Sequence, residues 1–302
     1  MRVLVTGATG FVGRATCEEL RERGHEVVAL IRRPGSEPDG TRAVLGDIAT
    51  EDPGQLREAL AEAKPECVIH LAAEIASQRS EAKIEATNVD GTRRLVDAAR
   101  AAGGEPKVVF CSTVVTGEAH GELLEPGKPL PVETPYGRSK QAGERIVAES
   151  GLPYAIVRPS HVYGGGGWYE EEFVKRLRQP GRFAVIGRGD NWWDVVRVED
   201  VASALIDAAE KAPSGGIYHA VDDEPIRFYD FIALTAKALG VGPPRRVPAL
   251  LARLAAGRHA VTAVTRSARS SNARLKEELG WMPNFPTAEV GVPDAVASLQ
   301  SA

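Results

Sequence analysis

Tyr136 and Lys140 are the residues of this 302-residue sequence whose types and spacing most directly suggest acid–base chemistry. Residues four apart share one face of a helix, so a phenol and an ammonium at these positions can approach one another. A free phenol has a pKa of about 10 and is a poor base at neutral pH, but a neighbouring cation favours the phenolate and lowers that pKa. The pair therefore predicts proton exchange between Tyr136 and a hydroxyl or carbonyl group of a substrate.

A glycine-rich turn, Thr6–Gly13, lies near the amino terminus between an expected strand and an expected helix. Glycine permits positive φ and lets backbone N–H groups approach a pyrophosphate, and the helix amino terminus adds unpaired N–H groups and a positive dipole end. A tight turn without a ligand is the alternative. We expect dinucleotide binding, so that hydride moves to or from a nicotinamide while Tyr136 moves the proton. The residues expected to contact it here are Gly7, Thr9, Gly10, Phe11, Val12 and Gly13.

Two arginines, Arg32 and Arg33, follow the second expected strand, where an acidic residue would hold the ribose hydroxyls of NAD. Cations at this place suit the additional 2′-phosphate of NADP, and Arg14 could face the same phosphate. The sequence therefore favours NADP over NAD. The alternative is that these arginines are solvated and that Glu37 or Asp39 reaches the ribose.

Strand-like and helix-like segments alternate along the chain and must position these residues. Such alternation predicts βαβ units, and hence an α/β fold with a doubly wound parallel sheet of the Rossmann type. Apolar runs mark the strands and 3.6-residue spacing marks the helices. The expected strands are Val3–Thr6, Glu26–Ile31, Cys67–Leu71, Val108–Ser112, Tyr154–Arg158 and Ile217–Val221; the expected helices are Val12–Arg23, Gln55–Ala63, Glu85–Ala102 and Tyr136–Ser150; Val195–Ala209 is a strand followed by a helix.

After Tyr163 the pattern becomes irregular, and Gly164–Gly167 is a run of four glycines that is typical of a mobile junction. Proline punctuates the remaining chain beyond Asp222. We expect a smaller, discontinuous carboxy-terminal substrate domain beside the nucleotide-binding one. The predicted division is residues 1–165 and 195–221 for the NAD(P)-binding domain, and 166–194 and 222–302 for the substrate-binding domain.

Composition excludes several other classes of protein. The 37 Lys and Arg against 41 Asp and Glu give a net charge of −4 without a basic block, which disfavours nucleic acid as a partner. No apolar run approaches the roughly 18 residues of a membrane helix, and the first residues do not resemble a signal peptide. Three widely spaced cysteines fit reduced thiols, and the six histidines form no metal-binding pair. We expect a cytoplasmic protein without a metal site.

Several motifs together resemble the extended type of short-chain dehydrogenase/reductase, the NAD-dependent epimerase/dehydratase group. The resemblance covers about residues 1–240, and it is specific as a set although each motif alone is weak. It includes the glycine turn and the Tyr136/Lys140 pair. The further motifs are Gly46–Ile48 after a third strand, His70–Ala73 after the fourth, Asn88–Thr92 in the long helix, Arg158–Gly164 and Val198–Ala202.

The resemblance implies roles for further residues. A catalytic hydroxyl is expected at the end of the fifth strand, five residues before Gly117, which gives Ser112 with Thr113 as the second candidate; that hydroxyl would hydrogen-bond to the reacting oxygen. It also implies cofactor contacts, for which the alternatives are packing at the end of the sheet for Leu71 and Ala72, and an ordinary cap or helix-surface polar group for Asn88. The implied cofactor contacts are Asp47, Ile48, Leu71, Ala72, Ala73, Asn88, Tyr136, Lys140 and Pro159.

The sequence departs from the group's pattern where substrates bind. Val114 and Val115 stand where dehydratases of the group carry an Asp-Glu pair, and valine cannot transfer protons, so dehydration is not expected. His161 and Trp193 replace an asparagine and an arginine that lie near the diphosphate of sugar nucleotides. An indole offers one N–H and an apolar face instead of a forked cation. These changes favour an uncharged, partly apolar substrate, although Arg188 could substitute for the arginine.

Thr113, His161, Trp168 and Trp193 are therefore the expected substrate contacts, with packing at the seam between domains as the alternative for the tryptophans. The predicted function is transfer of hydride between a nicotinamide and an alcohol or carbonyl carbon of a small substrate. An epimerase of a sugar or sugar nucleotide would use the same residues, and a non-enzymatic NADP sensor is a third hypothesis. The helices Glu85–Ala102 and Tyr136–Ser150 pair across a dimer in many relatives, so a homodimer is possible.

Overall fold

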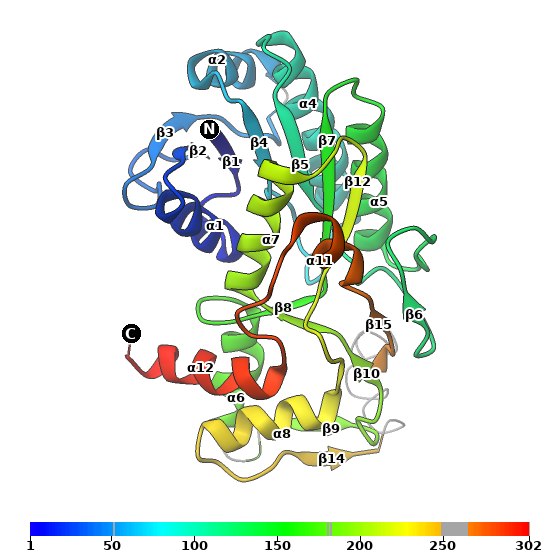
Figure 1. Cartoon of the computed structure of the whole chain (residues 1–302). Coiled ribbons are helices and arrows are strands. Elements are labelled where there is room, and N and C mark those ends of the chain that lie inside the picture. Colours follow the sequence, from blue (N-terminus) through cyan, green and yellow to red (C-terminus); the bar gives the residue numbers. More distant parts are fainter. Residues whose placement is uncertain (51, 180, 182, 249–264, 302) are drawn as a thin grey trace.

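A parallel β-sheet forms the centre of the molecule (Figure 1). The computed structural model describes residues 1–302 except 51, 180, 182, 249–264 and 302. Within this described part, seven strands pair in the order β12-β7-β5-β4-β1-β2-β3, and every neighbouring pair is parallel. The strands are β1 (Arg2–Thr6), β2 (Glu26–Ile31), β3 (Arg42–Leu45), β4 (Cys67–His70), β5 (Lys107–Cys111), β7 (Tyr154–Pro159) and β12 (Gly216–Ala220).

Helices cover both faces of this sheet, which confirms the doubly wound α/β fold that the sequence predicts. One core joins α1 (Phe11–Glu22) and α7 (Val198–Lys211) to side chains such as Val3 and Val5 of β1. The opposite core joins α2 (Pro53–Ala63), α4 (Gly91–Ala101) and α5 (Pro135–Ala148) to side chains such as Leu4. Because both faces are buried, the strands read as continuous apolar runs.

The start of α5 is fixed by its cap and by close packing on the sheet. Thr134 precedes the helix and its hydroxyl accepts a hydrogen bond from the Gly137 N–H at 2.9 Å, while Pro135 occupies the first turn. About two turns into the helix, a Cβ at Gly143 would lie 2.5 Å from the Phe110 ring of β5. Both features hold the helix that carries Tyr136 and Lys140 close to the end of β5.

Two expected elements differ from those observed. The edge strand β3 was not marked by the hydrophobic pattern, because Arg42 and Leu45 are exposed and only four residues pair with β2. The expected single helix Glu85–Ala102 begins earlier, as α3 (Glu81–Ile84), and passes through a π-helical turn, η1 (Glu85–Asp90), before α4. Such π turns interrupt α-helices frequently at functional sites.

A second group of elements lies below the sheet in Figure 1 and has its own aromatic core, formed by residues between Tyr163 and Val296. The segment around Trp281 is different, because α11 (Ala273–Leu279) and Trp281 pack into the core shared by α1 and α7. The remaining described elements are β6 (Leu123–Leu124), β8 (His161–Tyr163), η2 (Glu170–Val174), α6 (Lys175–Leu177), β9 (Ala184–Ile186), β10 (Trp192–Trp193), β11 (Val195–Arg197), β13 (Ile226–Arg227), α8 (Phe228–Ala238), β14 (Arg245–Val247), β15 (Arg269–Ser270) and α12 (Ala288–Ser301).

Candidate active site

The glycine turn before α1 is packed too closely for other residues. Gly7 has a φ of +68°, and a Cβ there would lie 2.7 Å from the Ala72 backbone nitrogen. A Cβ on Gly13 would lie 2.1 Å from the Gly7 carbonyl oxygen. Gly10 precedes α1 in an extended conformation and, having no side chain, leaves the first N–H groups of the helix without a side-chain cap. The turn therefore fits a bound phosphate and, with it, a dinucleotide.

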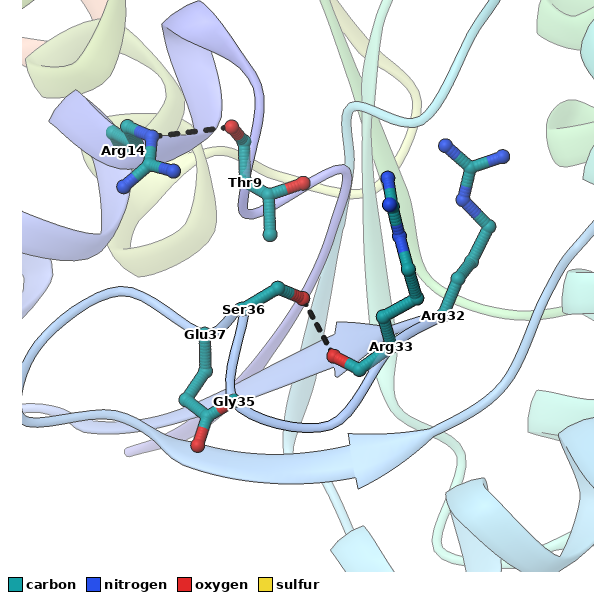
Figure 2. Close-up of a pocket in the computed structure, with 7 residues that line it drawn as sticks. All are labelled: Thr9, Arg14, Arg32, Arg33, Gly35, Ser36 and Glu37. Atoms are coloured by element: carbon teal, nitrogen blue, oxygen red, sulfur yellow. Dashed lines mark hydrogen bonds between the residues drawn. The ribbon is translucent and has the colours of Figure 1, made fainter.

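A polar cavity of about 450 Å³ opens beside this turn (Figure 2). Three guanidinium groups line it, those of Arg14, Arg32 and Arg33, and the Arg14 Nε donates to the Thr9 carbonyl oxygen at 3.2 Å. Glu37 also lines it, but in Figure 2 its carboxylate points away from the three guanidinium groups. The residues lining this cavity are Thr9, Arg14, Arg32, Arg33, Gly35, Ser36 and Glu37. Asp39, the other acidic residue that the sequence offers for the ribose, does not line it.

Asp47 and Ile48 follow β3 as expected, but among the described residues Asp47 makes only local hydrogen bonds, and the Ile48 carbonyl accepts from Arg94 of α4 at 3.1 Å. The Asp47 carboxylate accepts from the Ala49 N–H at 2.9 Å, and Ile48 is buried in the core beneath α4. Across the sheet, the N–H groups of Leu71 and Ala72 both donate to the Thr6 hydroxyl, at 3.2 and 3.1 Å. Those two residues, with the half-buried Ala73 after them, form the ledge against which the glycine turn packs.

The two hydroxyls after β5 differ sharply. Thr113 donates to the Pro159 carbonyl oxygen at 3.2 Å and accepts from the Val115 N–H at 2.9 Å, so its single hydroxyl proton is already used. Ser112 is 3% exposed, and its Oγ has no hydrogen-bond partner among the residues that the structure describes. Of the two candidates, Ser112 is the one whose hydroxyl is available to a ligand.

Tyr136 and Lys140 lie in α5 beside the end of β5. The Lys140 ammonium stands 4.3 Å from the centroid of the Phe110 ring, and burial lowers the pKa of Lys140 although Cys111 and Glu144 oppose this. Burial raises the pKa of Tyr136, and the Cys111 thiol adds to the rise. The pKa of Tyr136 therefore moves in the opposite direction from the sequence-based expectation, because desolvation by burial is the largest effect on the phenol.

Asn88 is placed away from an open cofactor surface. It is 2% exposed in the π turn η1, and its amide nitrogen donates to Ser139 Oγ at 2.9 Å and to the Glu74 carbonyl oxygen at 3.0 Å. Its Oδ1 accepts from the Glu74 N–H at 2.7 Å. These bonds tie the loop after β4 to α5, the helix that carries Tyr136 and Lys140.

His161, Trp168 and Trp193 come together in the aromatic core. The rings of His161 and Trp193 stack with centroids 4.1 Å apart, and Trp168 packs edge-on against both. Trp193 is only 3% exposed, which agrees with packing at the seam, yet its indole Nε1 has no partner within the described residues. Nδ1 of His161 lies 3.0 Å from the Asp194 carbonyl oxygen; since a carbonyl can only accept, Nδ1 donates and a neutral ring keeps a lone pair on Nε2.

Arg266 is a buried cation that the sequence reasoning did not select. Its guanidinium donates to the backbone carbonyl oxygens of Gly117 and, at 2.8 Å, Val114, so it holds the segment that follows Ser112. By contrast, the Arg188 side chain is 87% exposed and pairs with Asp190 at 3.0 Å. No motif or spacing in the sequence distinguishes Arg266 from the other arginines around it.

The described residues contain no group of three or more His, Cys, Asp or Glu side chains arranged to hold a metal ion. None of the helices described is long and apolar enough to cross a membrane. All three cysteines are free thiols.

Comparison with known proteins identifies the family. Residues 3–220 match the NAD dependent epimerase/dehydratase family. The chain is 31% identical over 304 residues to a 3-diazoavenalumate denitrifying reductase of Streptomyces sp., covering 97% of this chain and 99% of that one. It is 31% identical to a UDP-glucose 4-epimerase of Mycolicibacterium smegmatis, covering 96% of each chain.

Among solved structures, a UDP-glucose 4-epimerase of Thermus thermophilus in complex with NAD aligns over 100% of both chains with a TM-score of 0.84 at 27% identity. The glycine turn and the neighbouring arginine-lined cavity fit a dinucleotide. The chain therefore belongs to the NAD-dependent epimerase/dehydratase family and is an NAD(P)-dependent enzyme of the extended short-chain dehydrogenase/reductase type.

Proposed function

We propose that this enzyme is an NADPH-dependent reductase that moves hydride between the nicotinamide and a carbonyl or alcohol carbon of a small, uncharged substrate. The observation that carries this proposal is the buried Ser112 hydroxyl, which lies unpaired within the described part of the chain beside the Tyr136 and Lys140 helix. When bound, the nicotinamide would supply or take up the hydride. The protein's own residues would then manage the oxygen and its proton.

Ser112 would donate a hydrogen bond to the reacting oxygen and stabilise the charge that develops there. Tyr136 would give that oxygen its proton, because burial raises the pKa of the phenol and keeps it protonated at neutral pH. Lys140 would support the phenolate that remains after transfer. In the reductive direction the proton passes from the neutral phenol of Tyr136 to the substrate oxygen.

NADPH is proposed over NADH because three guanidinium groups line the cavity beside the glycine turn, where the 2′-phosphate would lie. The carboxylate of Glu37 points away from those groups, which weakens the alternative of ribose binding by Glu37 (Figure 2). Replacing Arg33 by Ser should raise the Kd for NADPH about tenfold and leave that for NADH nearly unchanged. Equal or tighter binding of NADH by the unaltered enzyme would overturn the assignment.

An uncharged substrate is proposed because the position expected to hold an arginine carries Trp193, inside an aromatic core. Arg188 is solvent-exposed and forms an ion pair with Asp190, and the Arg266 guanidinium donates to backbone carbonyls. We therefore propose neither arginine as a residue that binds a substrate diphosphate. His161 Nε2 would accept a hydrogen bond from a substrate hydroxyl, and Thr113, Trp168 and Trp193 would form the surrounding wall. The Streptomyces relative is named as a reductase, which agrees with transfer of reducing equivalents to a substrate and with nothing more specific.

The deciding experiment follows absorbance at 340 nm with NADPH and a panel of small aldehydes and ketones. A reductase consumes the cofactor stoichiometrically, and Tyr136→Phe should lower kcat by about 10²-fold or more. An epimerase of sugar nucleotides, which the UDP-glucose 4-epimerase relatives keep as the second candidate, would show no net consumption. Interconversion of UDP-sugars without a change at 340 nm would therefore replace the proposal by that candidate.

The organisation of the enzyme belongs to the same proposal. We assign residues 1–165 and 195–221 to cofactor binding, and 166–194 and 222–302 to substrate binding, with α11 of the latter packed on the former. Three free thiols support a cytoplasmic enzyme. The half-exposed outer faces of α4 and α5 leave room for a homodimer, which light scattering of the purified protein would test.

A further inference from the structure

A chain of buried hydrogen bonds starts at the end of β1, directly before the glycine turn. Thr6 Oγ1 lies 2.7 Å from Nδ1 of His70 at the end of β4, and Nε2 of the same ring lies 3.0 Å from Oγ1 of Thr92 in α4. Thr6, His70 and Thr92 are each no more than 1% exposed. Water therefore does not compete for these hydrogen bonds, and each side chain relies on its neighbour in the chain of hydrogen bonds to satisfy its polar atoms.

The direction of each bond follows from what each atom can donate. The Thr92 hydroxyl donates its single proton to the Asn88 carbonyl oxygen at 2.6 Å, so toward His70 it can only accept. Nε2 of His70 therefore carries the ring proton, and Nδ1 accepts from the Thr6 hydroxyl. Thr6 Oγ1 in turn accepts from the N–H groups of the two residues after His70. The chain thus selects a single neutral tautomer of His70.

Asn88 continues the chain to the catalytic helix. Its amide nitrogen donates to Ser139 Oγ at 2.9 Å, and Ser139 donates to the carbonyl oxygen of Tyr136 at 2.8 Å. Ser139 is 2% exposed, so this end of the chain is buried as well. The backbone carbonyl of Asn88 accepts from Thr92 and its side-chain amide donates to Ser139, so two sets of buried hydrogen bonds meet at this one residue. Together, and through the covalent frame of Asn88, they join the strand end beside the phosphate turn to the backbone of Tyr136.

We propose that His70, Thr92 and Asn88 are positioning residues that couple occupancy of the glycine turn to the placement of Tyr136. The proposal rests on dinucleotide binding at that turn, as proposed above. Gly7 packs against Leu71 and Ala72, whose N–H groups donate to the Thr6 hydroxyl. A phosphate that orders the glycine turn would therefore also order the hydrogen bond from Thr6 to His70, the first of the chain. In each later hydrogen bond, the hydroxyl, ring nitrogen or amide can act only as donor or only as acceptor. Ordering of the glycine turn is therefore transmitted along the hydrogen bonds, through Asn88, to the backbone of Tyr136.

The test uses 2′-phospho-ADP and, in parallel, ADP, because either would fill only the adenosine and diphosphate part of the site and would not reach α5. Amide hydrogen exchange of residues 135–140 reports the first turn of α5. With the wild-type enzyme, we expect the bound nucleotide to slow this exchange at least about fivefold. Thr92→Val keeps the shape of the side chain but removes the hydroxyl, and should abolish the slowing; Thr92→Ser should restore it.

Thr235→Val is the matched control, because Thr235 is equally buried and its hydroxyl donates to a carbonyl four residues earlier, that of Phe231 at 3.0 Å, but it lies in α8. This variant should lower the melting temperature and keep the slowing in α5. Thr92→Val protein that binds nucleotide and still shows wild-type slowing would overturn the relay, as would a wild-type enzyme that binds nucleotide with unchanged exchange. No nucleotide binding by the wild type in calorimetry would instead overturn the proposed cofactor function, and the relay with it.

Discussion

Two adjacent hydroxyls, on Ser112 and Thr113, show how burial can distinguish a residue that holds the fold from one that is open to a ligand. Leaving a buried hydroxyl without a partner costs roughly 1–3 kcal/mol, so a protein keeps such a group where a ligand completes its bonding. Ser112 is in that situation, whereas Thr113 satisfies two backbone groups. The family resemblance alone left both open, and the geometry separates them.

Ser112→Ala should lower kcat for carbonyl reduction about 10²-fold or more, because the developing charge loses one donor. The same change should leave the melting temperature unchanged or slightly raised, since it removes a buried polar atom that lies unpaired in the described structure. Steady-state kinetics and thermal unfolding measure the two effects separately.

Thr113→Val provides the contrast at the neighbouring position. It leaves the Val115 N–H without its partner and removes one of the hydrogen bonds to the Pro159 carbonyl, which also accepts from the Val114 N–H, so we expect a loss of about 1–3 kcal/mol of unfolding free energy. A Ser112→Ala enzyme with unchanged kcat, or one destabilised as much as Thr113→Val, would contradict the role given to Ser112.

The run Gly164–Gly167 shows how one element shapes another. The sequence suggests a mobile junction, but the structure gives a steric reason for glycine at two of the four positions. A Cβ on Gly164 would lie 2.8 Å from Val198, and one on Gly167 would lie 2.6 Å from the ring of Phe11, the first residue of α1. The run therefore lies closely against the helix whose amino terminus faces the phosphate turn.

Gly167→Ala should consequently weaken nucleotide binding as well as stability. The added methyl forces the Phe11 ring aside and disturbs the first turn of α1, at a cost of about 1–3 kcal/mol in unfolding free energy. Part of this cost should appear as an increase of about tenfold in the Kd for NADPH, measured by fluorescence titration.

Gly127→Ala is the control for this prediction, because nothing lies within 4 Å of a Cβ at Gly127 and its φ is not positive. It should change neither the Kd nor the melting temperature appreciably. Unaltered NADPH binding by Gly167→Ala would show that the glycine run and the phosphate turn are independent.

The elements that the sequence predicted well are those buried on both sides. Glu26–Ile31 was placed correctly as β2, and the other central strands and main helices were placed to within a few residues, because continuous apolar runs and amphipathic spacing mark them directly. The family resemblance implies a strand before Gly46, but the hydrophobic pattern does not give the bounds of β3, and among the two- and three-residue strands it predicts only β11, at Val195. The pairing of β3 and of the other short strands depends on neighbours distant in sequence, which no local pattern records.

At the site, prediction succeeded where backbone geometry dictates the residue type and was weaker where side chains choose partners. The glycine turn could be predicted, since positive φ and close approach at Gly7 require glycine. The contacts of Arg266 could not, because its partners are backbone carbonyls 149 and 152 residues away. The raised pKa of Tyr136 also escaped prediction, since desolvation depends on the assembled surroundings.

The molecule as a whole gathers polar side chains where its parallel strands end. Thr6, His70, Cys111 and Pro159 end β1, β4, β5 and β7, so their carboxyl ends meet along one edge of the sheet. Ligands of open α/β folds bind outside this edge, and the second group of elements lies there and encloses it. Enclosure also buries ionisable groups, and three histidines have a pKa lowered to about 3 for that reason.

His219 in β12 allows this effect of enclosure to be measured without touching the catalytic cluster. Burial, reinforced by the charge of Arg158 and partly offset by the Leu124 backbone, lowers the pKa of His219 to about 3, so the folded protein keeps the ring neutral at pH 5. In the unfolded chain the ring, with a pKa of about 6.5, takes up a proton there. The contribution of this group to stability is therefore fully present above about pH 6.5 and is lost as the pH falls toward 3.

His219→Leu removes this titration and places an apolar side chain of similar size at the same buried position. Other ionisable groups cancel when variant and wild type are compared at one pH, so the difference in unfolding free energy isolates His219. Between pH 8 and pH 5 that difference should move in favour of the variant by about 2 kcal/mol, measured by urea unfolding. His120→Leu, at the exposed His120, gives the effect of removing a surface histidine. A His219→Leu difference that is the same at both pH values would mean that β12 does not hold a neutral histidine in the folded enzyme.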